Sequence, residues 1–452
     1  MIAYTLTNLS DFSLIENESD IVELRLDLIN DFQSIANLKR SKPVIFTLRR
    51  PSDGGAFQGT EKERLNTIES YFKLKPDYFD LEDDLDPAFI EKMAKNYPEV
   101  KIIGSHHYLE HTPNNLSFPE NPHFYASKLA CFANSSIDAL RLMIALKNQK
   151  GRSIAVSMGD KGSFSRIINI ILGSYLTFAG DLQAIGQLPL AEMKQKYRVH
   201  QLNTSSFIYA LIGYPLTGSF GTIVHNAVMN SISYNGVYVN IKILPEEVGS
   251  FFQLTEQLPF KGLSVTMPLK EHCFPFLNKF SEDSINTINT ESREGFNTDG
   301  KGALNAIEEH YLVKGKTIVI LGAGGTAKAI YKEAVQRGAK VYVLNRTEDK
   351  AKELAGLDGF GLHKIKDLNQ NGYDLLIDAT SAAFPIEKEL LLPDSWFMDI
   401  KSVPPTESLQ KYAKKIIFGK ELFIHQAVLQ DEIWFNVKPL ELIKSLVWQR
   451  PP

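Results

Sequence analysis

The chain has 452 residues, which is too long for one ordinary hydrophobic core and predicts two or three domains. A hydrophobic fraction of 44%, a charged fraction of 23% and a net charge of -4 are typical of a globular protein and give no reason to expect nucleic acid or an acidic membrane as a partner. With only Cys131 and Cys273, the chain cannot form a disulfide scaffold or a cysteine-rich zinc site. The start of the sequence does not resemble a secretion signal, and the most apolar stretch, 167–178, is too short to span a bilayer. We therefore expect a cytoplasmic protein.

The first two hundred residues repeat one pattern, in which a short apolar run precedes a helical stretch. The eight runs are Ile2–Leu6, Ile21–Leu26, Val44–Leu48, Tyr78–Leu81, Lys101–Gly104, Tyr125–Leu129, Ile154–Ser157 and Tyr175–Phe178. Strands that alternate with helices in this way predict a closed parallel (β/α)8 TIM barrel. Short buried runs of this kind also occur inside helices, so the prediction depends on the whole series.

A second series of strands begins near Phe207 and predicts a two-lobed α/β unit. Its expected strands are Tyr209–Ile212, Gly236–Ile241, Gly262–Val265, Lys316–Leu321, Lys340–Leu344, Asp374–Ala379 and Trp396–Ile400, the last four in a doubly wound Rossmann lobe. Because a short polar stretch at 202–206 separates the two series, we divide the chain into domains 1–205 and 206–452. Within the second domain, 206–300 plus 420–452 form the expected substrate lobe, and 301–419 form the cofactor lobe.

Polar side chains lie where the strands of the predicted barrel end, which is where barrel enzymes carry their active sites. Lys128 lies in the apolar segment YASKLAC, and loss of hydration there favours the neutral amine that a Schiff-base nucleophile requires. His107, at the end of the preceding strand, can act as a general acid and base. Arg25, Arg49 and Arg166 can bind the carboxylate and hydroxyl groups of a polar substrate. Taken singly, a lysine or histidine of this kind is more often an ordinary structural residue.

Together these motifs resemble type I 3-dehydroquinate dehydratase over roughly residues 1–195. The matching segments, in the family's order, are VELRLD, TLRR with DGG, DLED at 80–83, SHHY, the single Lys128, VSMG with SR, and a late GQ. The resemblance implies that Lys128 forms an imine with the substrate ketone and that His107 transfers the protons. It also implies that Glu23, Arg25, Arg49, Asp53, Arg166 and Gln187 bind the substrate. Two positions depart from the family, since Asp53 replaces a glutamate beside the histidine and Gln183 replaces a serine near the end of the domain.

The glycine-rich segment GAGGTAKA at 322–329 lies between a predicted strand and a predicted helix. Glycines at such a turn let the backbone approach a pyrophosphate at the positive end of the helix, although a tight turn without a ligand also uses glycine. The next strand ends in Asn345, Arg346 and Thr347, without the carboxylate that binds the ribose 2′-hydroxyl of NAD. With Lys350 one turn later, these residues indicate NADP. The expected cofactor-binding residues are Gly322, Ala323, Gly324, Gly325, Thr326, Ala327, Asn345, Arg346, Thr347 and Lys350.

The substrate lobe carries a lysine and an aspartate that can form a proton relay beside a ketone, Lys270 in SVTMPLK and Asp299 in GFNTDG. A surface salt bridge and an Asx-type turn are the ordinary alternatives. The motifs of this half resemble shikimate dehydrogenase over roughly residues 207–452. The resemblance implies reduction of 3-dehydroshikimate to shikimate, with site residues Thr217, Ser219, Thr266, Lys270, Asn289, Asp299 and Gln426. Thr217, Ser264 and Ser402 depart from the family, which usually has serine, asparagine and tyrosine at these positions.

The two resemblances support each other, because the product of the first reaction is the substrate of the second. This support is an analogy with known families and not a physical property of the residues. One alternative is a class I aldolase-like barrel fused to a quinate dehydrogenase. Another is a regulatory binding protein built from the same two domains, whose members tend to lose the nucleophile or the relay. Because Lys128, His107, Lys270 and Asp299 are all present, we predict a bifunctional enzyme with small-molecule substrates, NADP and no metal.

Overall fold

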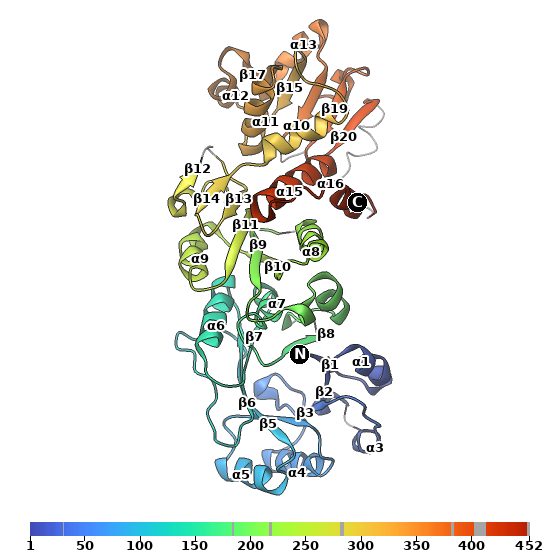
Figure 1. Ribbon diagram of the computed structural model, residues 1–452, viewed down its shortest axis with the longest axis vertical. Coiled ribbons are helices and arrows are strands. Elements are labelled where there is room, and N and C mark those ends of the chain that lie inside the picture. Colours follow the sequence, from blue (N-terminus) through green and yellow to red (C-terminus); the bar gives the residue numbers. More distant parts are fainter. Residues whose placement is uncertain are drawn as a thin grey trace. The chain divides into compact units, whose positions relative to one another are not determined.

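The computed structural model describes residues 1–29, 31–182, 185–216, 219–280, 284–380, 384–401 and 413–449. The chain divides into two compact units, Met1–Leu216 with Ser233–Phe260, and Thr217–Ile232 with Lys261–Pro452 (Figure 1). Among the described residues, no helix is long and apolar enough to cross a lipid bilayer.

The first unit contains eight parallel strands that form a nearly closed barrel. They are β1 (Ile2–Leu6), β2 (Ile21–Arg25), β3 (Val44–Thr47), β4 (Tyr78–Glu82), β5 (Lys101–Tyr108), β6 (Ala126–Phe132), β7 (Ser153–Met158) and β8 (Thr177–Gly180). The order of hydrogen-bonded neighbours is β7-β6-β5-β4-β3-β2-β1-β8. At the seam, the Tyr175 N–H just before β8 donates to the Ser153 carbonyl of β7 at 2.8 Å. The predicted TIM barrel is confirmed, although the sheet ladder stops short of full closure.

The barrel strands are buried on both faces, as expected for a parallel sheet covered by helices. Buried side chains form a core cluster of the barrel, among them Ala3, Ile21, Ile45, Ile103 and Ile154. The surrounding helices are α1 (Phe12–Glu18), α2 (Leu26–Ile29), α3 (Phe32–Ala36), α4 (Glu61–Phe72), α5 (Pro87–Asn96), α6 (Ser136–Asn148) and α7 (Ser165–Ile168). Capping boxes at Thr60 and Ser135 begin α4 and α6.

Further strands follow the barrel in each unit. The first unit contributes β9 (Phe207–Gly213) and β10 (Gly236–Lys242), which pair in parallel, together with α9 (Val248–Thr255). The second unit contributes, in sheet order, β11 (Phe260–Val265), β13 (Thr287–Asn289), β14 (Glu294–Phe296) and β12 (Lys279–Phe280). The strands β12 to β14 have only two or three residues each, too few for the sequence pattern to reveal them.

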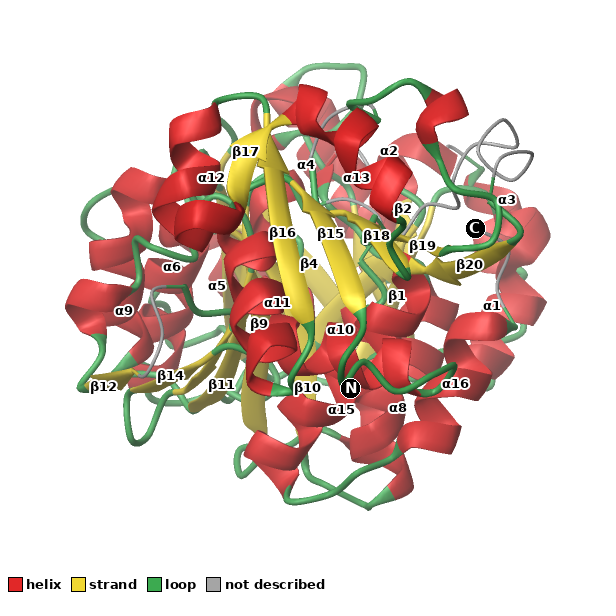
Figure 2. Ribbon diagram, turned by 90° about the horizontal axis from the view of Figure 1, so that it is seen from above, coloured by secondary structure: helices red, strands yellow, loops and turns green. Residues whose placement is uncertain are grey.

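The third sheet is wholly parallel and has the strand order of a Rossmann fold. Its strands, seen side by side in Figure 2, are β17 (Gly359–Gly361), β16 (Lys340–Asn345), β15 (Thr317–Leu321), β18 (Leu375–Asp378), β19 (Trp396–Asp399) and β20 (Lys415–Phe418). The helices of this unit are α8 (Gly221–Ser231), α10 (Asp299–Glu308), α11 (Gly325–Gln336), α12 (Glu348–Ala355), α13 (Ile365–Asn371), α15 (Gly419–Phe435) and α16 (Leu440–Trp448). The predicted Rossmann lobe is confirmed.

The first residue of α15 packs directly on the backbone that follows β19. A Cβ atom at Gly419 would lie 2.0 Å from the carbonyl oxygen of Lys401, a contact that neither backbone can relieve without moving. Glycine is therefore required where α15 begins, and it allows this helix to approach the sheet.

We expect Gly419→Ala to destabilise the second unit by about 1–3 kcal/mol, because the overlap outweighs the roughly 1 kcal/mol by which alanine favours a helix over glycine. Thermal unfolding measured by calorimetry would show the loss as a lower midpoint. Gly324→Ala is the matched control, since a Cβ there meets nothing within 4 Å. Equal midpoints for the two variants would show that α15 can move away from the sheet at no cost.

Candidate active sites

A cavity of about 110 Å³ lies in the first unit, where the barrel strands end. All eight residues predicted for the first site line it: Glu23, Arg25, Arg49, Asp53, His107, Lys128, Arg166 and Gln187. They come from different strands and loops, and the parallel barrel brings them together because its strands all end on one side. The apolar part of the lining includes Val156, Met158 and Phe178.

Lys128 at the cavity is paired with a buried carboxylate. Its Nζ donates to Asp80 Oδ2 at 2.7 Å and lies 4.7 Å from the centre of the Phe178 ring. Arg49 donates to the other oxygen of Asp80 at 2.6 Å. Burial by itself raises the pKa of Asp80, but the positive charges of Arg49 and Lys128 outweigh burial and hold that pKa below its ordinary range. Asp80 is therefore a permanent anion beside the Lys128 amine.

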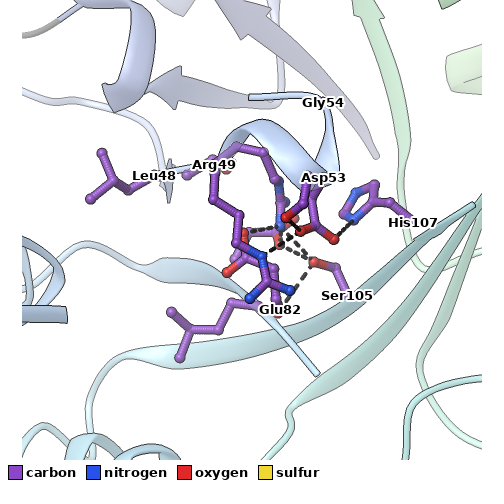
Figure 3. Close-up of polar contacts among 12 residues, drawn as sticks. Leu48, Arg49, Asp53, Gly54, Glu82, Ser105 and His107 are labelled. Carbon is purple, nitrogen blue, oxygen red and sulfur yellow. Dashed lines mark hydrogen bonds and ion pairs between the residues drawn. The ribbon is translucent and has the colours of Figure 1, made fainter. Parts of the chain in front are cut away.

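A second buried carboxylate, Glu82, lies two residues further along β4. It accepts from Arg49 at 3.0 Å (Figure 3). It also accepts from Arg64 at 2.8 Å, and Ser105 donates to Asp80 at 2.6 Å. DLED at 80–83 matches the family pattern, but neither Asp80 nor Glu82 is among the predicted site residues. Two carboxylates of one buried strand are an unusual signal, since unpaired charges are rarely buried.

His107 is buried at the mouth of the cavity, and its Nδ1 has no hydrogen-bond partner within the described part of the chain. The nearest acidic oxygen, Oδ1 of Asp53, lies 3.9 Å from this nitrogen (Figure 3). Burial lowers the pKa of His107 well below its usual value, and the positive charges of Arg49 and Lys128 lower it further. A neutral imidazole of this kind is ready to accept a proton.

Arg166 is almost completely buried, with 2% exposure, and its guanidinium donates to the carbonyl oxygens of Gly186 at 2.8 Å and Ile185 at 3.0 Å. No carboxylate of the described ranges lies within salt-bridge distance of it. Burial lowers the pKa of Arg166, since its charge is not compensated by an ion pair. A buried cation that faces a cavity without a counter-ion is suited to bind an anionic group of a ligand.

The remaining polar residues of the cavity hold one another in place. Glu23 accepts from Thr5 at 2.7 Å and from Thr47 at 2.8 Å, while Gln187 donates to Thr5 at 3.0 Å. Arg25 makes a two-pronged ion pair with Asp27 at 2.9 and 2.7 Å. Thr5 and Thr47 were not predicted, because hydroxyl groups have no distinctive sequence pattern.

In the second unit, the carboxylate of Asp299 is the centre of a buried network. Lys270 makes an ion pair with it, Asn286 donates at 2.6 Å, Gln426 at 2.5 Å and Thr326 at 3.0 Å. Burial raises the pKa of Asp299, but Lys270 and these hydrogen bonds outweigh burial and lower it below the ordinary value. The structure thus brings together the predicted Lys270, Asp299 and Gln426. It also places Thr326, predicted as a cofactor residue, against Asp299.

One predicted residue, Asn289, does not belong to this network. The sequence contains two Asn-Thr pairs, and the prediction chose Asn289, whereas the residue that contacts Asp299 is Asn286. The side chain of Asn289 accepts from the backbone N–H groups of Glu291 at 3.1 Å and Ser292 at 3.2 Å, and so stabilises the turn after β13. Residues 286 and 289 are an odd number of positions apart on an extended segment, so their side chains point to opposite faces.

Gln430, one turn after Gln426 on α15, was not predicted and connects two side chains of the substrate lobe. It donates to Thr287 at 3.0 Å and accepts from Ser264 at 3.0 Å. Ser264 therefore replaces the usual asparagine without losing a hydrogen-bonding role. Thr266 follows β11 and is partly buried, and Ser219 accepts from the Gly221 N–H at 3.1 Å, which places it at the start of α8. Thr217, Gln183 and Ser402 lie outside the described residues.

The glycine-rich turn connects β15 to α11. Gly322 has a φ of +106°, a conformation that favours glycine, and a Cβ there would lie 3.0 Å from the Ala379 carbonyl oxygen. The first turn of α11 begins after Gly324, whose position has no side-chain cap and would leave a Cβ in open space. Free backbone N–H groups at a helix start, with room beside them, fit a phosphate group. Asn345 donates to the Thr347 carbonyl at 2.9 Å, and Arg346, Thr347 and Lys350 are exposed.

Comparisons with known proteins agree with this division of sites. The family model of type I 3-dehydroquinase matches residues 5–204, that of the shikimate dehydrogenase substrate binding domain matches 211–290, and that of shikimate/quinate 5-dehydrogenase matches 305–396. The bifunctional 3-dehydroquinate dehydratase/shikimate dehydrogenase of Arabidopsis thaliana chloroplasts is 30% identical, over 95% of this chain and 79% of that protein. The chain belongs to this bifunctional family.

Two further relatives show how the similarity is distributed along the chain. The shikimate biosynthesis protein AroDE of Chlamydia pneumoniae is 31% identical and covers 92% of this chain and 90% of its own length. A crystal structure of a shikimate dehydrogenase in complex with NADP+ covers 55% of this chain and 96% of its own, with 31% identity and a TM-score of 0.50. The family resemblances stated from the sequence are thereby confirmed for both halves.

Proposed function

We infer that the chain catalyses two successive reactions of the shikimate pathway: dehydration of 3-dehydroquinate to 3-dehydroshikimate through a lysine Schiff base, and reduction of 3-dehydroshikimate to shikimate with NADPH. The observation that carries this inference is the barrel cavity, which holds an amine, a neutral imidazole and a buried guanidinium without a counter-ion. The pairing of Lys270 with Asp299 in the second unit supports the reductase. We place the boundary between the two activities near residue 205, and location in the cytoplasm stays a prediction.

In the dehydratase we assign the nucleophile to Lys128. Its amine adds to the substrate ketone, water leaves, and the resulting iminium cation takes the place of the ammonium beside Asp80. Because Asp80 stays ionised, it stabilises the iminium as it stabilised the ammonium. His107 then accepts the proton from the neighbouring carbon and returns a proton to the departing hydroxyl group. Arg166 binds the substrate carboxylate, and hydrolysis of the imine releases the product.

In the reductase we assign the proton to Lys270 and the positioning of Lys270 to Asp299. NADPH supplies a hydride to the ketone carbon when it is bound. Lys270 donates a proton to the ketone oxygen, while the ionised Asp299 holds the ammonium group and accepts from Asn286 and Gln426. Thr326 connects the start of α11 to Asp299, so the cofactor lobe and the proton relay share a hydrogen bond. The cofactor fits the glycine turn because its first N–H groups have no side-chain cap.

Reduction with borohydride in the presence of 3-dehydroquinate should attach the substrate to Lys128, since the iminium is the species that borohydride reduces. Mass spectrometry of the digested chain would locate the added mass. Lys128→Ala should abolish dehydration and leave reduction of 3-dehydroshikimate unchanged. Inactivation without an adduct, or an adduct on Lys161, would contradict the assignment.

Asn286→Ala should lower kcat/KM for 3-dehydroshikimate by roughly 10- to 150-fold, the value of one hydrogen bond to a charged group. Asn289→Ala is the matched control and should stay within a few-fold of the parent, because its side chain stabilises only the turn. Steady-state cofactor oxidation measures both, with dehydratase activity as the internal standard. A larger loss for Asn289→Ala would restore the prediction made from the sequence.

Arg346→Ala should weaken NADPH by roughly 10- to 150-fold and leave NADH nearly unaffected, because a charge-assisted contact to the 2′-phosphate contributes about 1.5–3 kcal/mol. Arg346 is exposed at the end of β16, so its replacement should not disturb the fold. Binding titrations with both cofactors give the comparison. Equal losses would mean that Arg346 contacts the adenine or supports the loop.

A further inference from the structure

Asp53 lies in a short segment after β3 whose backbone has little freedom. The segment begins with a 3-10 turn at Pro51–Asp53, and Gly54 follows in the left-handed region with a φ of +78°. A Cβ at Gly55 would lie 2.0 Å from the carbonyl oxygen of Arg49. The Ala56 N–H donates to Asp27 at 2.9 Å. The direction of the Asp53 side chain is therefore decided by its own contacts rather than by motion of the loop.

Those contacts lead away from the catalytic histidine. Asp53 Oδ2 accepts from Arg50 Nε at 2.5 Å and from the Ser52 hydroxyl at 2.8 Å. The same guanidinium donates through Nη2 to both oxygens of Asp84, at 2.6 and 2.5 Å. The remaining oxygen of Asp53 lies 3.9 Å from His107 Nδ1, which is too far for a hydrogen bond, and this nitrogen is left without a partner in the described chain.

A carboxylate at this position influences the protonation state of a neighbouring general base. A negative charge about 4 Å from an imidazole stabilises its protonated form, and a protonated imidazole cannot accept the substrate proton. Arg50 compensates part of the Asp53 charge and shares its own charge with Asp84. The other charged and titratable groups around His107 are Arg49, Lys128, Asp80 and His106, and those around Asp53 and Arg50 are Asp84 and Glu61.

We propose that Arg50 is a positioning residue of the dehydratase: it holds the Asp53 carboxylate out of hydrogen-bonding distance of His107 and compensates part of its charge, which favours the neutral form of His107. The proposal rests on the proposed role of His107 and names the group that sets its protonation state. Arg50 itself does not line the cavity. It acts only through Asp53, which does.

The test is a pH titration of His107 by NMR in the full chain, with carbon-13 at the imidazole Cε1. The ten histidines give up to ten signals, and the one absent from His107→Gln is assigned to His107. In Arg50→Gln the freed carboxylate should raise the pKa of His107 by about half a unit or more, the interaction of two charges about 4 Å apart in a well-solvated site. In Arg50→Gln with Asp53→Asn the pKa should return to the parent value.

Asp84→Asn is the matched control, because it breaks the salt bridge between Arg50 and Asp84 but leaves the one between Arg50 and Asp53. It should leave the titration of His107 within about two tenths of a unit of the parent, well below the effect of a free charge. An unchanged titration in Arg50→Gln, or an equal shift in Asp84→Asn, would overturn the proposal, since the effect would then be absent or due to a loosened loop.

The pH dependence of dehydratase kcat/KM separates this proposal from the proposed function. If His107 is the base, the acid limb should move to higher pH in Arg50→Gln by the same amount as the titration, while the reductase profile stays fixed. A shifted titration with an unmoved acid limb supports the electrostatic role of Arg50 and removes His107 as the base. An unmoved titration refutes the role of Arg50 whatever the rates show.

Discussion

Burying a lysine and two arginines in the middle of a barrel costs so much hydration free energy that the carboxylates of Asp80 and Glu82 must lie between them. Asp80 pairs with Lys128 and Arg49, and Glu82 pairs with Arg49 and Arg64. Removing one partner of such a pair typically costs about 3–5 kcal/mol, because the other charge is then left uncompensated. The dehydratase site depends on this network, since it keeps Lys128 in place and determines which groups around it are charged.

The same electrostatic principle operates in the reductase with different geometry. There a single carboxylate, Asp299, gathers Lys270, two amide groups and a hydroxyl from elements far apart in the sequence. Two of its partners reach it from helices: Gln426 comes from α15, which can approach the sheet because its first residue is glycine, and Thr326 comes from the first turn of α11. The packing of helices on the Rossmann sheet thus determines the reach of the proton relay.

The surroundings of His107 favour its neutral form, whereas those of Lys270 favour its charged form, in keeping with the proposed reactions. His107 is kept neutral by burial and by neighbouring cations, which suits a group that must first accept a proton. Lys270 is held against an ionised carboxylate, which suits a group that must first donate one. In both sites the acidic residue stays ionised and the basic residue changes its protonation state. The proposed steps therefore need no buried carboxylic acid.

The amino-acid sequence by itself determined the order of the strands along the chain, the two fold classes and the residues with distinctive chemistry. Lys128, His107, Arg166, Lys270 and Asp299 could be found because each interrupts an apolar strand end or lies in a specific motif. Only the tertiary structure decided which of them acquire partners. Asn286 rather than Asn289 contacts Asp299, and Asp53 pairs with Arg50 while its other oxygen lies 3.9 Å from His107. Such pairings join residues that local periodicity does not relate, because they arise only when separate strands end side by side.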